Sequence, residues 1–208
     1  MRPCPSYGRL PRSTKVKTFN VAADTPLQLC NSFNHCNVPE VKVDLQSDEH
    51  FMRKALRQAA KACEAEEVPV GAIVVRAGKI IARAWNQVEL LKDATAHAEM
   101  LALTQAEAAV GDWRLTDCDL YVTKEPCVMC AGALVHVRMR RVVFGCADLR
   151  SGGGGGIINL LQHPTLNHRC DITSGVLESE CAAILQDFFR KKRGRTGDTT
   201  ASAGENRH

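Results

Sequence analysis

Residues 68–85 read VPVGAIVVRAGKIIARAW, and this stretch is the clearest structural signal in the chain. Residues 72–75 are a continuous apolar run with the β-branched composition that is typical of a buried strand. A tight turn is predicted near Ala77 and Gly78, and residues 79–85 then predict a second strand. The stretch therefore predicts a β-hairpin.

Helical patterns flank the hairpin on both sides. Before it, Ser47 can cap a helix whose apolar residues recur at helical spacing. Near the other end of the chain, a helix from about Leu177 is predicted, because five apolar residues occupy positions i, i+3, i+4, i+7 and i+8. These residues are Cys181, Ile184, Leu185, Phe188 and Phe189.

Between these helices, strand and helix signals alternate. Residues 95–110 and 127–137 have helical composition, whereas residues 120–123 and 142–145 are short apolar runs suited to buried strands. Alternation of this kind predicts an α/β fold in which helices pack on a layered sheet.

A length of 208 residues predicts one domain with appended tails. Residues 1–46 have no persistent periodicity and no acidic residue before Asp24, so we expect a disordered extension. An arginine-rich, acid-poor start is also typical of an organellar targeting segment. Residues 196–208 are polar and predict a disordered tail, which leaves residues 47–195 as the folded domain.

Composition excludes several classes of protein. The chain is 45% hydrophobic and 24% charged, as in globular proteins, and no apolar run is long enough to predict a membrane-spanning helix. A net charge of +4 permits nucleic-acid binding where basic residues cluster. Ten cysteines without a signal peptide favour a reducing compartment, the cytoplasm, where close cysteine pairs bind metals or take part in redox chemistry.

Chemistry is expected where two predicted helices begin. Residues 97–99 (HAE) open one helix, and residues 126–130 (PCVMC) open the other, with Pro126 at its first helical position. Cysteines three apart share a helical face, and the positive helix end favours their thiolates. His97, Cys127 and Cys130 therefore predict three ligands of a tetrahedral Zn²⁺ with a fourth position for water. Glu99 is predicted to carry protons as general acid and base.

A C-x-x-C pair by itself leaves two other readings open, a redox dithiol and half of a structural zinc knuckle. The combination of H-x-E with P-C-x-x-C is the signature of zinc-dependent nucleobase deaminases. In these enzymes the metal acidifies water to a pKa of about 7 and the glutamate transfers protons. The combined pattern predicts hydrolytic deamination.

These motifs and their neighbours resemble bacterial tRNA-specific adenosine deaminases, members of the cytidine deaminase-like superfamily. The resemblance runs from about Asp48 to Arg193 and rests on VPVGA at 68–72, TAHAE at 95–99, YVTKEPCVMCAGA at 121–133 and HPxxNHR at 163–169. It implies a three-layer α/β/α sandwich with a central five-stranded mixed sheet, one zinc ion per subunit and a homodimer. It also implies that adenosine becomes inosine at the wobble position of a tRNA, in bacteria an arginine tRNA.

By position, the resemblance assigns contacts with the flipped nucleotide to Asn86 and Asn167, and places Asp148 near the tRNA. Asparagine amides match the mixed donor and acceptor edge of a purine or its ribose. From the residues alone, Asn86 fits a turn after a strand equally well, and Asn167 and Asp148 fit solvated loops.

The chain departs from the family pattern at three places: Lys124, where an apolar residue is common; Ala94, where proline often occurs; and five consecutive glycines at 152–156. The glycines suit either a close approach of RNA or a mobile loop. The basic residues available for phosphate contacts are Arg138, Arg140, Arg141, Arg150, Arg190, Lys191, Lys192, Arg193 and Arg195. The C-terminal run equally complements a helix dipole.

Three functions stay open at this point. The leading one is zinc-dependent deamination of adenosine in a tRNA anticodon loop. The second is deamination of a free base or nucleotide, of the guanine or cytosine type, because ligand spacing does not depend on substrate size. The third is a noncatalytic RNA-binding subunit that keeps zinc for folding, although a purely structural site has no use for Glu99.

Overall fold

The computed structural model describes residue 44 and residues 46–201, so the predicted extension lies almost entirely outside the described residues. The described elements are α1 (Asp48–Glu64), β1 (Gly71–Arg76), β2 (Lys79–Trp85), α2 (Val88–Leu91), α3 (Ala98–Val110), β3 (Cys118–Lys124), α4 (Val128–His136), β4 (Arg141–Cys146), β5 (Asp171–Ser174) and α5 (Glu178–Ala201).

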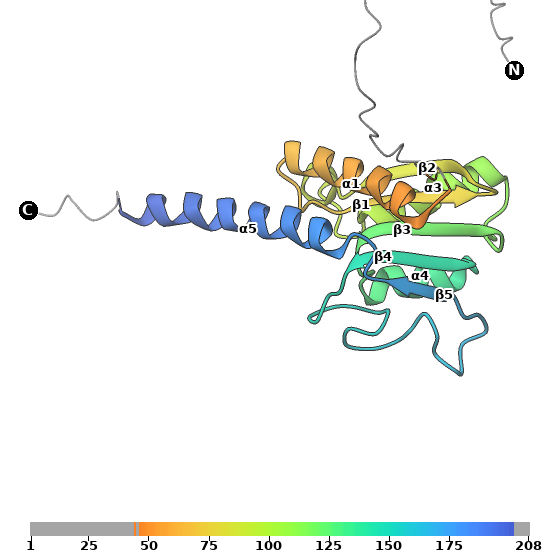
Figure 1. Cartoon of the computed structure of the whole chain (residues 1–208). Coiled ribbons are helices and arrows are strands. Elements are labelled where there is room, and N and C mark those ends of the chain that lie inside the picture. Colours follow the sequence, from red (N-terminus) through yellow and green to blue (C-terminus); the bar gives the residue numbers. More distant parts are fainter. Residues whose placement is uncertain (1–43, 45, 202–208) are drawn as a thin grey trace, which may run out of the picture. The chain divides into compact units, whose positions relative to one another are not determined.

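One five-stranded sheet has the order β2-β1-β3-β4-β5 (Figure 1). Strand β1 is antiparallel to both β2 and β3, whereas β3, β4 and β5 are mutually parallel. Parallel neighbours need a crossover connection, which α4 supplies between β3 and β4. The sheet is therefore mixed, and β2, β3 and β4 end at the same edge.

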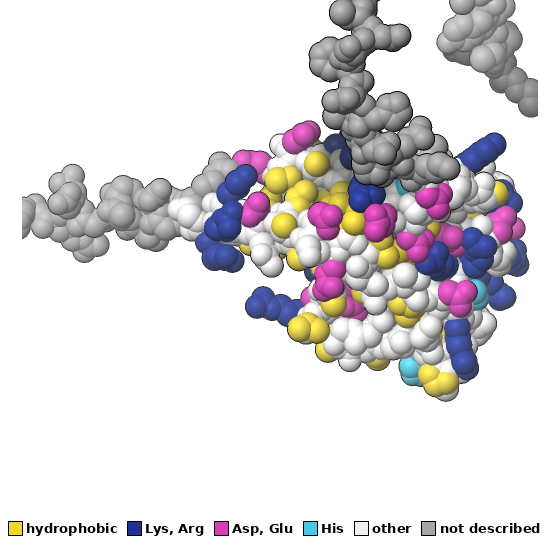
Figure 2. Space-filling model, viewed as in Figure 1, with side chains coloured by type: hydrophobic (Ala, Val, Ile, Leu, Met, Phe, Trp, Pro, Cys, Tyr) yellow, Lys and Arg dark blue, Asp and Glu magenta, His cyan; other side chains and the backbone are white. Residues whose placement is uncertain are grey.

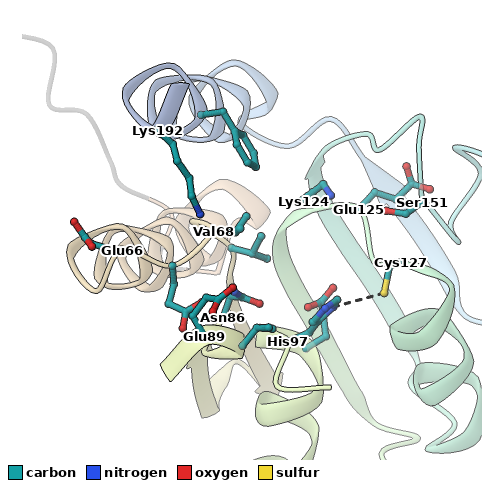
Figure 3. Close-up of a pocket in the computed structure, with 15 residues that line it drawn as sticks. Glu66, Val68, Asn86, Glu89, His97, Lys124, Glu125, Cys127, Ser151 and Lys192 are labelled. Carbon is teal, nitrogen blue, oxygen red and sulfur yellow. Dashed lines mark hydrogen bonds between the residues drawn. The ribbon is translucent and has the colours of Figure 1, made fainter. Parts of the chain in front are cut away.

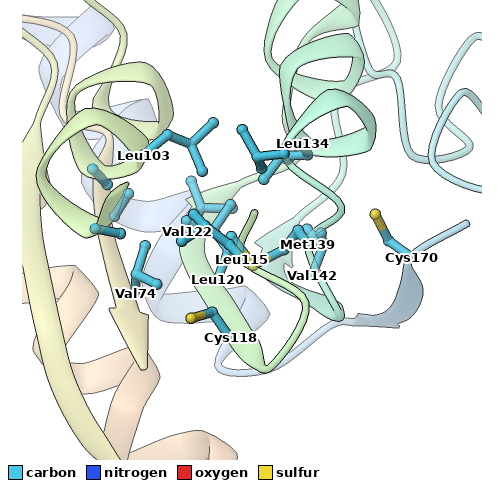
Figure 4. Close-up of a cluster of buried hydrophobic side chains, with 14 of the residues drawn as sticks. Val74, Leu103, Leu115, Cys118, Leu120, Val122, Leu134, Met139, Val142 and Cys170 are labelled. Atoms are coloured by element: carbon cyan, nitrogen blue, oxygen red, sulfur yellow. The ribbon is translucent and has the colours of Figure 1, made fainter. Parts of the chain in front are cut away.

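Both faces of the sheet are buried, because successive side chains of a strand point to opposite sides. On one face, Ile73, Tyr121 and Val143 pack with residues of α1 and α5. On the other face, Val74 and Val142 join a larger cluster with residues of α3 and α4 (Figure 4). The predicted three-layer α/β/α sandwich with a five-stranded mixed sheet is confirmed.

The start of α1 is hydrogen-bonded to strands β3 and β4 and, through Arg141, to β5. Ser47 caps the helix, as predicted, by accepting a hydrogen bond from the His50 amide. Asp48 accepts hydrogen bonds from Arg141 Nη2 (2.6 Å) and from the Tyr121 hydroxyl (2.8 Å), and Arg141 also donates to Thr173. Burial raises the pKa of Asp48, but the bonds from Arg141 and Tyr121 outweigh burial and hold that pKa below its ordinary value.

Helix α3 begins three residues later than the sequence predicts. The amide and the hydroxyl of Thr95 both donate to Asp93 Oδ1, at 2.8 and 2.7 Å, so a turn occupies the predicted first residues of the helix. His97 is the N-cap, with extended backbone angles of φ −69° and ψ 153°.

Helix α4 also begins later, and the prediction that Pro126 is its first helical residue is wrong. Cys127 is the N-cap, and it pairs with Gly152 in an isolated antiparallel bridge. The carbonyl of Pro126 accepts a hydrogen bond from the Gly153 amide at 2.8 Å. These contacts keep the chain extended until the helix starts at Val128.

Three other features differ from the sequence-based expectations. The residue patterns did not indicate α2 or β5, which have only four residues each. Helix α5 continues to Ala201, beyond the expected end of regular structure at Arg195, because extending a helix costs less than starting one. Phe189, predicted for the buried face of this helix, is 42% exposed.

Among the described helices, none is long and apolar enough to cross a membrane.

Helix α1 approaches the sheet closely at Gly71. A Cβ atom there would lie 2.2 Å from the carbonyl oxygen of Ala55 and 2.3 Å from the amide nitrogen of Ala59, so α1 rests directly on the start of β1. By contrast, no heavy atom lies within 4 Å of a Cβ added at Gly132 in α4.

We expect Gly71→Ala to lower the free energy of unfolding by about 3 kcal/mol or more, at the upper end of overpacking effects, because α1 must move off the sheet. Gly132→Ala is the matched control and should raise it by roughly 0.5–1 kcal/mol through helix propensity. Urea unfolding followed by circular dichroism measures both. Wild-type stability of Gly71→Ala would contradict the described packing.

Candidate active site

The candidate site lies at the sheet edge where β2, β3 and β4 end. Asn86 follows β2, Glu125 follows β3, and Asp148 comes soon after β4. The start of β1 reaches the same edge, because Gly71 pairs with Trp85 at the end of β2. Residues that are far apart in the sequence therefore meet here.

Three predicted ligands converge between the starts of α3 and α4. Nδ1 of His97 lies 3.6 Å from Cys127 Sγ and 3.5 Å from Cys130 Sγ, and the two sulfurs are 3.6 Å apart. All three ligand atoms lie within 4.8 Å of one another.

These separations fit a tetrahedral zinc ion. Zinc bonds of about 2.3 Å to sulfur and about 2.0–2.1 Å to nitrogen place two sulfurs about 3.8 Å apart and a sulfur and a nitrogen about 3.6 Å apart. Two thiolates and an imidazole are also a donor set that zinc prefers. The chemistry and the spacing of the three residues thus suit zinc with one position left for a further ligand.

The backbone favours a thiolate at Cys127, whereas the bond to Cys127 and burial raise the pKa of Cys130. His97 and Cys127 are the N-caps of α3 and α4, and neither helix start has a side-chain cap. Unpaired amides and the positive end of the dipole therefore face the trio. The hydrogen bond from Cys130 lowers the pKa of Cys127 to about 3, and His97 adds to this effect against the opposing influence of burial.

Glu99 lies in the first turn of α3 beside the trio. It is 4% exposed, and its side chain is hydrogen-bonded to Cys130. Burial raises the pKa of its carboxyl group. All four residues predicted from the H-x-E and P-C-x-x-C pattern are therefore close together.

A cavity of about 370 Å³ opens onto this cluster (Figure 3), within the size range of small-molecule sites. Its lining residues are Glu66, Glu67, Val68, Val70, Asn86, Val88, Glu89, His97, Glu99, Lys124, Glu125, Cys127, Ser151, Phe189 and Lys192. The wall combines apolar side chains, carboxyl groups and two lysines, and it draws on residues from both ends of the domain.

Of the three predicted substrate contacts, only Asn86 lines the cavity. Its amide Nδ2 donates to Glu67 Oε2 at 3.1 Å. Asn167 is exposed in the loop before β5 and lies outside the cavity lining. Asp148 is buried, and its carboxylate accepts hydrogen bonds from Lys124 Nζ at 2.6 Å and from the Ser151 hydroxyl.

Glu125 organises the glycine run, a role that the sequence analysis missed. Its Oε1 accepts hydrogen bonds from the amides of Gly154 (2.9 Å) and Gly156 (2.8 Å), and its Oε2 accepts one from the amide of Asp148 (2.8 Å). A Cβ at Gly152 would lie 2.4 Å from this carboxylate. The glycines thus allow the loop to wrap around a buried glutamate. The available signal was the run of five glycines itself, because residues without a side chain permit a close approach.

Three of the predicted phosphate-binding arginines already have acidic partners. Arg140 pairs with Asp119 at 2.7 Å, Arg141 pairs with Asp48 at 2.6 Å, and Arg190 pairs with Asp187 at 2.6 Å. Lys and Arg side chains also gather on α5 (Figure 2), where Arg190, Lys191 and Arg193 are exposed. Arg190 and Arg193 line a second hollow together with Arg150.

Comparison with known proteins shows extensive similarity. The family model MafB19-like deaminase matches residues 46–193. The chain is 49% identical to the tRNA-specific adenosine deaminase of Bacillus subtilis over 149 residues, which cover 72% of this chain and 92% of that protein. It is also 49% identical to the tRNA-specific adenosine deaminase of Aquifex aeolicus over 145 residues, 70% of this chain and 95% of that one.

Solved structures of deaminases are also similar to this chain. A structure from a study of A-to-I editing by tRNA:A34 deaminases is 45% identical, with a TM-score of 0.63, and the match covers 65% of this chain and 99% of that chain. A guanine deaminase from Nitrosomonas europaea is 25% identical, with a TM-score of 0.60 over 77% of this chain and 98% of its own.

The ion pair beside the cavity predicts a pH-dependent contribution to stability. Burial raises the pKa of Asp148, but hydrogen bonds from Lys124, Ser151 and the Arg150 amide outweigh burial and lower this pKa to about 2. A depressed carboxyl pKa stabilises the fold above the ordinary value of 3.8, and this stability is lost as the pH falls from there towards 2.

We expect Lys124→Met to lower the free energy of unfolding by about 1–3 kcal/mol at pH 7, because it leaves a buried carboxylate without its counter-charge. The difference from wild type should shrink between pH 3.8 and 2, where Asp148 becomes protonated. Urea unfolding at pH 7 and pH 3, in the presence of a chelator, measures it. Arg53→Met, which breaks an exposed pair with Glu49, should cost about 0–0.5 kcal/mol at either pH. An equal loss in the two variants would contradict the prediction.

Proposed function

Because this chain belongs to the MafB19-like deaminase family, we propose that it converts adenosine to inosine at the wobble position of tRNA, with zinc as its metal ion. The similarity to proteins named tRNA-specific adenosine deaminase supports this substrate. The observation that carries the proposal is the meeting of His97, Cys127, Cys130 and Glu99 at one cavity.

In this proposal the metal ligands are Nδ1 of His97 and the sulfur atoms of Cys127 and Cys130. Zinc, when bound, lowers the pKa of water to about 7 and so supplies a nucleophile at neutral pH. The start of α4 supports the site by favouring the thiolate form of Cys127, and metal binding would displace the proton of Cys130.

Glu99 moves the protons of the reaction. Water adds to C6 of adenine, and Glu99 takes one of its protons and delivers it to N1. The same carboxyl group then transfers the second proton to the amino group on C6. The C6–N bond breaks, ammonia leaves, the oxygen forms the C6 carbonyl of inosine, and Glu99 returns to its starting state.

The remaining predicted contacts divide according to their positions. Asn86 lines the cavity and suits the base itself. Asn167 is exposed and suits a flanking nucleotide outside the cavity. Asp148 is paired with Lys124 and Ser151, so it acts near the tRNA through the loop that it holds.

The proposed partner is the anticodon loop of a tRNA, an arginine tRNA by the family resemblance. A base inside a folded RNA must be extruded before it can enter a cavity of this kind. The cations of α5 and Arg150 lie next to the cavity, because Phe189 lines both it and the second hollow. They are placed to hold phosphates while the base is turned inward.

Three further assignments belong to the same proposal. We assign the deaminase domain to residues 47–195. We expect a homodimer, and the exposed Val128, Met129, Ile157 and Ile158 offer apolar surface for a second copy. We place the protein in the cytoplasm, because thiolate ligands persist in a reducing compartment.

One observation favours a second candidate, deamination of a free base such as guanine. The chain shares its fold with a guanine deaminase at 25% identity. The metal chemistry would be the same, so only the size of the accepted substrate separates the two functions. A noncatalytic RNA-binding subunit is the third candidate, and the buried Glu99 beside the ligands argues against it.

Metal content tests the ligand assignment. We expect about one zinc per chain in the wild type and in Glu99→Ala, and a loss of most of it in Cys127→Ala, because a site with two remaining ligands binds weakly. Cys63→Ala is the control, since Cys63 lies on α1 and outside the trio. Mass spectrometry of the reduced, purified proteins measures the metal. Full zinc in Cys127→Ala would refute the assignment.

Activity tests the substrate. We expect the wild type to convert adenosine to inosine in an arginine-tRNA anticodon stem-loop and to leave free adenosine, cytidine and guanine unchanged. Glu99→Ala should lower kcat by about 10²–10⁴-fold, the usual effect of removing a general acid and base. Sequencing detects inosine, and a chelator control checks the metal requirement. Turnover of guanine alone would favour the second candidate, and no turnover of any substrate would favour the third.

A further inference from the structure

We propose that Glu67 is a positioning residue that sets which base the cavity accepts, by fixing the orientation of the Asn86 side-chain amide. The inference rests on the proposed function, because it concerns recognition of adenine. Neither the motifs nor the family resemblance singled out Glu67.

Glu67 lies in the loop between α1 and β1 and is 1% exposed. Its Oε2 accepts a hydrogen bond from Asn86 Nδ2 at 3.1 Å, and its Oε1 accepts one from the Leu90 amide at 2.7 Å. Leu90 lies in α2, whose N-cap Gln87 makes no capping hydrogen bond. The carboxylate therefore satisfies the start of α2 and holds Asn86 at the same time.

This arrangement permits only one orientation of the Asn86 amide. A carboxylate accepts hydrogen bonds and donates none, so the NH₂ group of Asn86 must face Glu67. The Asn86 oxygen is then turned away from Glu67. No described residue donates a hydrogen bond to that oxygen. Every described side-chain oxygen or nitrogen that is fully buried has a hydrogen-bond partner, so the Asn86 oxygen is not fully buried. Because Asn86 lines the cavity, its oxygen faces the cavity.

The Asn86 amide therefore offers two hydrogen-bonding groups to the cavity: its oxygen, which is an acceptor, and next to it the second N–H, which is a donor. An asparagine amide in this state pairs with adenine, which offers the N6 donor and the N7 acceptor side by side. Guanine offers two acceptors, O6 and N7, at the corresponding edge. A fixed oxygen therefore favours adenine over guanine at this wall of the cavity.

The substitution Glu67→Gln keeps the shape of the side chain but reverses the orientation of the Asn86 amide. The Leu90 amide can only donate, so the glutamine oxygen stays with Leu90 and the glutamine NH₂ faces Asn86. Asn86 must then turn its own oxygen towards Gln and its NH₂ towards the cavity. The cap on α2 is kept, whereas the pattern offered to the base becomes two donors.

A double-mutant cycle on the zinc-loaded protein tests this role. We expect Glu67→Gln to lower kcat/KM for the adenosine stem-loop about 10- to 100-fold, the effect of losing one paired contact with a base. In an Asn86→Ala background, the same substitution should change kcat/KM by less than about twofold. The matched control is Glu64→Gln, which removes an exposed charge one turn earlier and should leave kcat/KM unchanged. A loss of equal size in both backgrounds would show that Glu67 acts structurally and would overturn the proposal.

A second readout does not depend on turnover. The side-chain NH₂ signals of Asn86, identified in ¹⁵N–¹H spectra by their absence in Asn86→Ala, should shift in Glu67→Gln and not in Glu64→Gln. Unchanged Asn86 signals in Glu67→Gln would overturn the proposal. If the wild type deaminates no substrate, the proposed function fails, and the spectra still decide whether Glu67 fixes the amide.

Discussion

A carboxylate that is removed from water must be hydrogen-bonded, and this requirement shapes the wall of the cavity. Glu67 accepts hydrogen bonds from Asn86 and from the start of α2, and Glu125 accepts them from three backbone amides. Asp148 accepts them from Lys124 and Ser151. Each carboxylate joins segments that are distant in sequence. The loops at this sheet edge are thus held by specific donors rather than by apolar packing, which concentrates in the two clusters on the faces of the sheet.

The direction of the strands explains why those segments meet. Strand β1 is antiparallel to both of its neighbours, so β2, β3 and β4 all end at one edge and deliver Asn86, Glu125 and Asp148 to it. The trio of His97, Cys127 and Cys130 lies at this edge, because α4 starts soon after β3. Ligand sites at the carboxyl ends of parallel strands are common in α/β sheets for the same reason.

The central strands, the main helices and the proximity of His97, Cys127 and Cys130 could be predicted from the sequence, because each has a strong local signal. The apolar run at 72–75 and the spacing of Cys127 and Cys130 are examples. The late start of α4 could not be predicted locally, since it depends on the bridge between Cys127 and Gly152. The roles of Glu67 and Glu125 were also missed, because a glutamate looks solvated until its donors from distant loops are known.

The position of Phe189 and Lys192 in the cavity wall has a consequence for biosynthesis. A polypeptide leaving the ribosome has already exposed His97, Cys127 and Cys130 long before α5 has been translated. The recess can therefore close only after these three side chains have been synthesised, and its C-terminal wall is the last part of it to be completed.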